Sequence, residues 1–166
     1  MARDAGFEDF YHGTRHRVVT FLYAVSGDAV EAQDAAQEAY VRAWQRWSTV
    51  SGYDDPEAWV RKVGYRLCVN RWRKARNRIV AYRRHGAVPV AEPPGEDTVA
   101  LVVALKTLPV PVRVAITLHH LLDLPVAEVA AQTGVSVNTV KARLVRGRKT
   151  LATLLGREPS GEYEHA

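Results

Sequence analysis

Residues 126–149 constrain the fold of this chain more than any other stretch of the sequence. Apolar residues first recur there at a spacing of three and four, which predicts a short amphipathic helix. These residues are Val126, Val129 and Ala130. Gly134 then gives the backbone the freedom that a tight turn needs, and Ser136 is a favourable N-cap for a second helix. A short helix, a glycine turn and a capped second helix together predict a helix-turn-helix.

The second predicted helix is strongly basic and contains no acidic residue. Its expected buried stripe consists of Val137, Val140 and Leu144. A rigid basic helix with polar residues in its first turn suits the major groove of duplex DNA. The residues that we expect to contact duplex DNA are Ser136, Asn138, Thr139, Lys141, Arg143, Arg146 and Lys149. A solvated basic end on an ordinary helical protein is the alternative, but the turn, the cap and the charge all agree with DNA binding.

The whole chain is predicted to be all-α, with two small helical domains joined by a flexible linker. The first domain covers residues 1–85 and the second covers residues 99–155. Residues 86–98 are rich in proline and acidic residues, and we expect them to form the linker. Residues 156–166 are expected to form a short disordered tail, so regulation by a fused C-terminal extension is not expected.

The first domain carries local signals for several helix boundaries. Asp28 followed by Glu31 reads as a capping box, and Asp55 followed by Pro56 reads as the start of another helix. Between these helices, residues 48–54 are expected to form a polar loop. The expected core stripe of the first of these helices is Ala32, Ala35, Ala36, Ala39, Tyr40, Ala43, Trp44 and Trp47. That of the second is Trp59, Val60, Val63 and Leu67.

Charge and aromatic residues add a second candidate contact with nucleic acid. The net charge is +5, and residues 61–84 contain ten lysine or arginine residues and no acidic residue. Basic residues interleaved with aromatic ones suit single-stranded nucleic acid, because cations follow the phosphates and rings stack on exposed bases. Core packing is the preferred role for Trp44, Trp47 and Trp59, whereas Tyr53 and Trp72 are open between packing and stacking.

Other classes of protein find little support in the sequence. A lone Cys68 excludes an internal disulfide, and no cysteine and histidine cluster has the spacing of a zinc site. We interpret His119 and His120 as surface or cap residues rather than as metal ligands. No apolar run reaches membrane length and no signal-peptide core follows Met1, so we expect a cytoplasmic protein without membrane insertion. No cofactor is expected.

Three motifs, in order and at family-like spacing, resemble the extracytoplasmic-function (group 4, sigma-70 family) RNA polymerase sigma factors. Residues 31–40, EAQDAAQEAY, resemble region 2.2 of that family. Residues 58–74, AWVRKVGYRLCVNRWRK, are similar to its promoter-melting region 2.3–2.4. Residues 108–118, LPVPVRVAITL, followed by the predicted helix-turn-helix, are similar to region 4. The resemblance covers roughly residues 7–153, and its three motifs together are highly specific.

The resemblance implies a division of labour among the residues. Asp34, Gln37 and Glu38 match the face that docks on the β′ clamp of core RNA polymerase. Residues 48–54 match the segment that captures a flipped base of the −10 element, and residues 136–149 match the reader of the −35 element. The residues expected at the melted −10 strand are Tyr53, Lys62, Arg66, Trp72, Arg73 and Arg76. The β flap of the polymerase and an anti-sigma protein are further implied partners.

Two other functions compete with a promoter-specificity subunit. An autonomous helix-turn-helix regulator with an N-terminal helical interaction domain is the main alternative, but such regulators usually dimerise and no long heptad seam occurs. An enzyme would have to use His119, His120 and Asp123, or the pair Asp34 and Glu38. Neither set is accompanied by a nucleophile elbow, a glycine-rich phosphate loop or a metal set, so we expect no catalytic activity.

Overall fold

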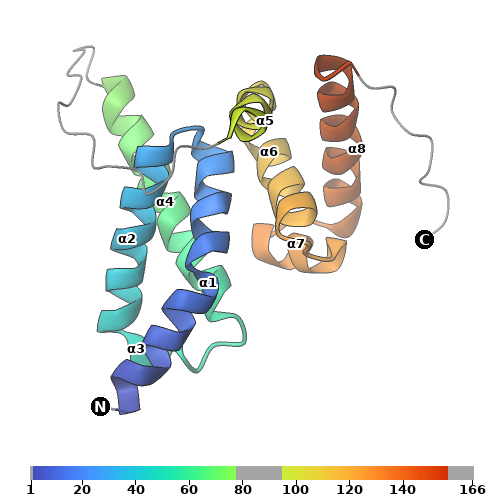
Figure 1. The fold of residues 1–166 in the computed structure, drawn as a ribbon. Coiled ribbons are helices and arrows are strands. Elements are labelled where there is room, and N and C mark those ends of the chain that lie inside the picture. Colours follow the sequence, from blue (N-terminus) through green and yellow to red (C-terminus); the bar gives the residue numbers. More distant parts are fainter. Residues whose placement is uncertain (1, 78–94, 157–166) are drawn as a thin grey trace. The chain divides into compact units, whose positions relative to one another are not determined.

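The computed structural model describes residues 2–77 and 95–156, which form α-helices and short connections. No β-strand occurs within these two ranges, and the prediction of an all-α fold is confirmed. The chain divides into two compact units, residues 1–94 and residues 95–166, which are described separately below (Figure 1).

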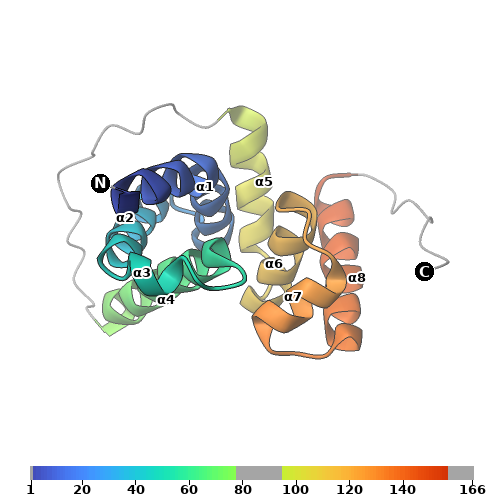
Figure 2. The same cartoon turned by 90° about the horizontal axis from the view of Figure 1, so that it is seen from below.

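In residues 2–77 the first unit is a bundle of three long helices and one short helix. Helix α1 spans Ala2–Ser26, α2 spans Ala29–Gln45, α3 spans Trp47–Val50 and α4 spans Pro56–Asn77. Helices α1, α2 and α4 pack against one another, as both views of the fold show (Figures 1 and 2). The bundle core includes Val18, Leu22, Val25, Ala32, Ala35, Ala39, Val50, Val60 and Cys68, each at most 1% exposed. The alanine face of α2 is buried as the sequence predicts.

The buried face of α4 differs from the predicted stripe. Val60 and Leu67 are buried, but Trp59 and Val63 are only half-buried. Gly64 faces inward instead, and a Cβ placed there would lie 2.7 Å from Cδ1 of Leu22 on α1. Absence of a side chain at Gly64 therefore lets α1 and α4 approach closely, and that approach decides which face of α4 is turned inward.

Two tryptophans also lie elsewhere than predicted. Trp44 is 54% exposed, so its assignment to the core is wrong, whereas Trp47 is buried in the separate helix α3. Helix α2 ends at Gln45, and Trp47 then packs on the ring of Phe10, with the centroids 4.9 Å apart. Because α3 reaches Val50, the loop predicted over residues 48–54 is shorter and begins at Ser51.

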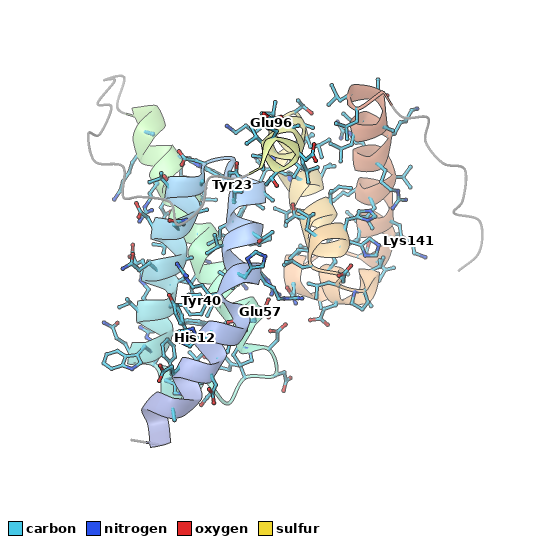
Figure 3. All side chains as sticks on the ribbon, in the orientation of Figure 1. His12, Tyr23, Tyr40, Glu57, Glu96 and Lys141 are labelled. Atoms are coloured by element: carbon cyan, nitrogen blue, oxygen red, sulfur yellow. The ribbon has the colours of Figure 1, made fainter. Side chains whose placement is uncertain are left out.

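Arg61 belongs to the predicted basic block, but its side chain is buried in the interior of the first unit. It is only 3% exposed, and its Nη1 donates to Oε1 of Glu57 at 2.7 Å. Arg17 of α1 donates to the same carboxylate oxygen at 3.0 Å. Figure 3 labels Glu57 near the start of α4. Two guanidinium groups thus converge on one carboxylate and link α1 to α4, because a buried charge must be paired.

Residues 95–156 of the second unit contain five helical segments. Helix α5 spans Glu96–Lys106, α6 spans Val110–Ile116, the π-helical turn η1 spans Thr117–Leu121, α7 spans Val126–Thr133 and α8 spans Val137–Leu154. Its core includes Val102, Leu105, Leu108, Val112, Ala115, Ile116, Leu118, Val129, Val140 and Leu144. Arg113 of α6 donates to the carbonyl oxygens of Leu105, Lys106 and Leu108, and so ties α6 to the end of α5 and the turn that follows it.

The start of α5 corrects the predicted linker boundary. Residues 96–98 were expected to be part of the linker, but α5 begins at Glu96 with Gly95 as its N-cap. Glu96 and Asp97 lie in the first turn, where negative charge complements the positive end of the helix dipole. The same acidic residues that indicate a linker in the sequence are thus favourable at a helix start. Residues 86–94 of the predicted linker, and the predicted tail from residue 157, lie outside the described residues.

Candidate nucleic-acid interface

The predicted helix-turn-helix is present in the second unit. Helix α7 ends at Thr133 and is capped by Gly134, whose φ of 71° places it in the left-handed region and whose N–H donates to Ala130 O at 2.9 Å. Ser136 caps α8, because its Oγ accepts from Thr139 N at 3.1 Å and also lies 2.9 Å from Thr139 Oγ1. The hydroxyls of Ser136 and Thr139 therefore hold the start of the helix. Both residues were predicted to contact DNA.

Helix α8 packs against α6 through a face whose central residue, Gly147, has no side chain. A Cβ at Gly147 would lie 2.6 Å from Cγ1 of Ile116 and 3.0 Å from Cγ1 of Val112. Val140 and Leu144 are buried on the same face, but Val137 is 40% exposed, so its predicted place in the buried stripe is wrong. The close contact at Gly147 fixes the rotation of α8 about its own axis, and with it the residues that face outward.

The outer face of α8 holds most of the predicted duplex contacts. Asn138, Lys141, Arg146 and Lys149 are exposed, whereas Arg143 is half-buried. The side chain of Lys141 projects from α8 on the side away from α6 (Figure 3). Helical spacing puts Asn138 and Lys149 in one row, with Arg146 beside it and Lys141 and Arg143 on opposite flanks. The structure thus brings Asn138, Arg146 and Lys149 together on the outer face of α8, with Lys141 and Arg143 on either side of it.

Helix α4 carries a second basic row. Its start is capped by Asp55, whose Oδ1 accepts from Ala58 N at 2.9 Å, as predicted. Lys62, Arg66 and Arg73 are exposed, and their spacing places them on the side opposite Gly64 and Leu67. Three predicted single-strand contacts are therefore aligned along about three turns of helix.

The remaining predicted single-strand residues are less tightly grouped. Tyr53 is 44% exposed in the loop before α4, where its N–H donates to Val50 O at 3.1 Å. Trp72 is half-buried, and its position next to Arg73 in the sequence turns it about 100° away from the basic row of α4. The backbone of Arg76 is helical, but its side chain lies outside the part of the chain that the structure describes.

The predicted docking residues lie on α2, but they differ in their surroundings. Asp34 and Gln37 are exposed. Glu38 is half-buried and engaged by two guanidinium groups, with Oε1 2.6 Å from Nη2 of Arg42 and Oε2 3.3 Å from Nη2 of Arg71. Asp34 is therefore the freer of the two carboxylates on this face.

An apolar hollow next to Gln37 was missed by sequence reasoning. Its volume is about 270 Å³, and it is lined by Phe7, Tyr11, Gln37, Tyr40, Val41 and Trp44. Val41 is 48% exposed and Trp44 is 54% exposed. Asp34, Gln37, Val41 and Trp44 follow a spacing of three, four and three, which places them on one side of α2. The only sequence signal for this surface is Val41, an apolar residue out of phase with the alanine stripe.

His119 and His120 contact each other, and His119 also contacts the backbone of the turn that follows. His119 Nδ1 lies 2.7 Å from Leu124 O, and the rings of His119 and His120 are in edge contact with centroids 4.8 Å apart. His120 is exposed at the surface, yet its partial burial lowers its pKa, and His119 and Arg148 lower it further, whereas Asp123 opposes them. Asp123 itself has a φ of 56° in the turn after η1. Nowhere in residues 2–77 and 95–156 do three or more potential ligands gather as a metal site.

Two buried groups in the first unit have shifted pKa values that fit a structural role. Burial raises the pKa of Tyr40 to about 12, although its hydroxyl is only 2.7 Å from Thr14 Oγ1. Burial likewise raises the pKa of the Cys68 thiol to about 12. Such a thiol stays protonated and is a poor nucleophile.

Among the helices of residues 2–77 and 95–156, none combines the length and the hydropathy that crossing a membrane requires.

A helix-turn-helix in one unit and an exposed basic helix in the other are features typical of DNA-binding proteins. The family model for sigma-70 region 2 matches residues 10–78, and that for sigma-70 region 4 matches residues 98–151. The two matches fall in the two compact units, one in each.

Known proteins narrow this class further. The chain is 32% identical over 149 residues to the ECF RNA polymerase sigma factor SigM of Mycobacterium tuberculosis, covering 88% of this chain and 74% of SigM. It is 30% identical over 138 residues to SigL of the same organism, covering 78% of each chain. The chain belongs to the extracytoplasmic-function sigma factors, the promoter-specificity subunits of bacterial RNA polymerase.

A solved structure agrees on the fold. It is the sigma factor RpoE of Bartonella quintana, crystallised in complex with the anti-sigma factor NepR. The TM-score is 0.73 at 22% sequence identity, and the match covers 91% of this chain and 97% of that chain.

Proposed function

We propose that this sigma factor uses three separate helix surfaces for three contacts: α2 for core polymerase, α4 for the melted −10 strand and α8 for the −35 duplex. The observation that carries this assignment is a shared arrangement. On each helix one face is buried and the opposite face carries exposed contact residues, acidic or polar on α2 and basic on α4 and α8, whereas Glu38, Trp72 and Arg143 are half-buried. The autonomous-regulator alternative is not favoured, because both sigma-70 regions match this chain.

Helix α8 is proposed to lie in the major groove of the −35 element. Asn138 and Lys149 in one row, with Arg146 beside them, face the base edges. Lys141 and Arg143 on the two flanks reach phosphates on opposite strands. Arginine can donate two hydrogen bonds to guanine O6 and N7, which makes Arg146 the residue best suited to guanine. Ser136 and Thr139 contribute by fixing the helix start, and the positive end of the helix dipole then favours a nearby phosphate.

Helix α4 is proposed to guide the melted strand. Lys62, Arg66 and Arg73 provide a line of positive charge for phosphates, and the exposed ring of Tyr53 provides a surface on which an extruded base can stack. Opening the duplex this way needs charge and stacking surfaces but no catalytic group. The protein is thus proposed to act as a regulatory subunit without an active site of its own, in the cytoplasm and on the nucleoid when active.

The polymerase contact is proposed to combine charge and apolar area on α2. Asp34 supplies an unengaged carboxylate, Gln37 supplies an amide, and Trp44 supplies a large exposed ring beside the hollow. Aromatic anchors next to specific polar groups are typical of residues that dominate binding energy at interfaces. Glu38 holds Arg42 and Arg71, so its contribution is to shape this face rather than to offer a free charge.

Charge reversal tests this assignment. Asp34→Lys should weaken binding to core polymerase by roughly ten-fold or more, equivalent to about 1.4 kcal/mol. Trp44→Ala should weaken it by a similar factor through lost apolar contact. Asp54→Lys reverses an exposed carboxylate in the loop before α4 and serves as the matched control. Wild-type affinity of both Asp34→Lys and Trp44→Ala, with unchanged helicity, would refute α2 as the docking surface.

We also propose an anti-sigma partner that holds the free protein inactive. Support comes from the similar fold of RpoE, which was crystallised with its anti-sigma factor.

Binding to promoter DNA should also depend on core polymerase. Two basic DNA-binding surfaces in separate units gain affinity when a third body, here core polymerase, fixes their separation. Titrating the free protein onto duplex promoter DNA tests this dependence. Weak binding without core polymerase is expected, whereas nanomolar affinity in physiological salt would contradict it.

A further inference from the structure

The outer row of α8 contains an apolar residue where a DNA-facing helix would be expected to be polar. Asn138, Ala142, Val145 and Lys149 are spaced by four, three and four residues, which places them in one row opposite the buried Leu144 and Gly147. Val145 is 58% exposed. Ala142 is exposed as well and lies one turn before Val145. A small apolar surface thus lies within the proposed base-reading face.

Packing within the second unit does not account for Val145. The contact of α8 with α6 is made through Gly147, on the other side of the helix. A β-branched residue is also less favourable than lysine, arginine or alanine at an exposed helical position. Lys141 and Lys149, four residues before and after Val145, are both exposed. The sequence therefore places the less helix-favouring, apolar side chain at the centre of a solvated basic face.

Thymine supplies the matching chemistry. In the major groove each base pair presents a distinct pattern, and thymine alone presents an apolar group, its C5 methyl. We propose that Val145, with the Ala142 methyl beside it, recognises a thymine methyl and so determines one thymine position of the −35 element. This inference rests on the proposed role of α8, and it adds the residue that reads thymine to those that read polar base edges.

The neighbouring cations make this contact possible. Lys141 and Arg143 on the two flanks of α8 would hold the phosphates and fix the depth of the helix in the groove. Val145 then approaches a methyl group at van der Waals distance without leaving a polar group unpaired. An amide or a carboxylate at this position would instead have to find a hydrogen-bond partner on the base edge.

Selection with the complete holoenzyme tests the inference. Wild-type and Val145→Ala proteins are each assembled with core polymerase, and promoters with a randomised −35 element are selected by binding. At one position of the −35 element the wild type should enrich thymine over the other bases. For Val145→Ala the enrichment of thymine at that position should be about four-fold lower. Val103→Ala is the control, because Val103 is also 58% exposed but lies on α5. It should leave every base preference unchanged.

A chemical substitution in the DNA gives an independent readout. Replacing the selected thymine by deoxyuracil removes only the methyl group, and should weaken wild-type holoenzyme by about four-fold. Val145→Ala holoenzyme should respond clearly less to the same replacement, because the Ala142 methyl remains but the two Cγ methyl groups of Val145 are lost. Equal losses for both proteins, or no loss for either at any thymine, would overturn the inference. A role of α8 in reading the −35 element would fail separately, if substitutions at Asn138 and Arg146 also left all base preferences unchanged.

Discussion

Arg71 of α4 joins two carboxylates of α2: its Nη1 lies 3.5 Å from Oε1 of Glu31, and its Nη2 lies 3.3 Å from Oε2 of Glu38. Burial raises the pKa of Glu31, and Asp28 and Asp34 add to that effect, while Arg71 acts in the opposite direction. Arg71 on α4, the helix proposed to contact DNA, therefore helps to position the carboxylates on α2, the helix proposed to dock on the polymerase.

Loss of Arg71 should weaken the first unit. Arg71→Ala leaves Glu31 partly desolvated without its cation, and we expect the free energy of unfolding to fall by roughly 1–2 kcal/mol. Urea unfolding followed by tryptophan fluorescence measures this, because all four tryptophans lie between residues 44 and 72. Lys74→Ala, at an exposed site on the same helix, is the control and should change stability by less than about 0.5 kcal/mol.

Gly147 should not tolerate even a methyl group. Gly147→Ala places a Cβ 2.6 Å from Ile116, and we expect a destabilisation of about 1–3 kcal/mol because α8 must shift away from α6. Amide hydrogen exchange across α6 and α8 reports this change in the full chain.

A matched substitution separates packing from helix propensity. Gly13 is also helical, but nothing lies within 4 Å of a Cβ placed there. Gly13→Ala should therefore stabilise the first unit by about 0.5–1 kcal/mol, since alanine is the better helix former. Stabilisation by both alanines would show that the close contact at Gly147 does not exist in solution.

The thiol of Cys68 should be unreactive in the folded protein. It is 1% exposed and its pKa is raised to about 12, so at about pH 8 it is both inaccessible and protonated. Alkylation monitored by mass spectrometry should be undetectable without denaturant and fast in urea. Rapid labelling of the native protein would mean that the α1, α2 and α4 bundle opens readily.

His120 should make the second unit sensitive to acid. Its side chain is exposed at the surface, but its pKa is lowered in the folded state by partial burial, by His119 and by Arg148, against the opposing effect of Asp123. As the pH falls below about 6.5, the unfolded chain binds a proton that the folded chain does not, so stability is lost. His120→Gln should reduce the loss of hydrogen-exchange protection between about pH 7 and pH 5. An identical pH profile in wild type and variant would contradict this account.

Local signals in the sequence were sufficient to predict four of the helix ends, although not the end of α2 or the start of α5. Gly134, Ser136, Asp28 and Asp55 all act as predicted, because a cap depends on atoms within a few residues. The capping box is incomplete, however. Glu31 contacts Arg71 on α4, and Ser26 Oγ accepts from Asp28 N in place of the Glu31 side chain.

Which face of a helix turns inward was harder to predict from periodicity. Trp44, Trp59, Val63 and Val137 were assigned to cores but are exposed or half-buried. The inward faces of α4 and α8 are centred on Gly64 and Gly147, and a glycine contributes no hydrophobic signal. Partners distant in sequence decide these cases, as the ion pairs of Glu57 with Arg17 and Arg61 also show.

The central claim is that this chain directs core RNA polymerase to promoters with defined −35 and −10 elements. Run-off transcription with purified core polymerase on genomic fragments, with and without this protein, tests it most directly. The account predicts transcripts that start at discrete sites only when the protein is present, downstream of two shared upstream elements. Transcripts that do not depend on the protein, or start sites without a shared −35 and −10 sequence, would contradict it.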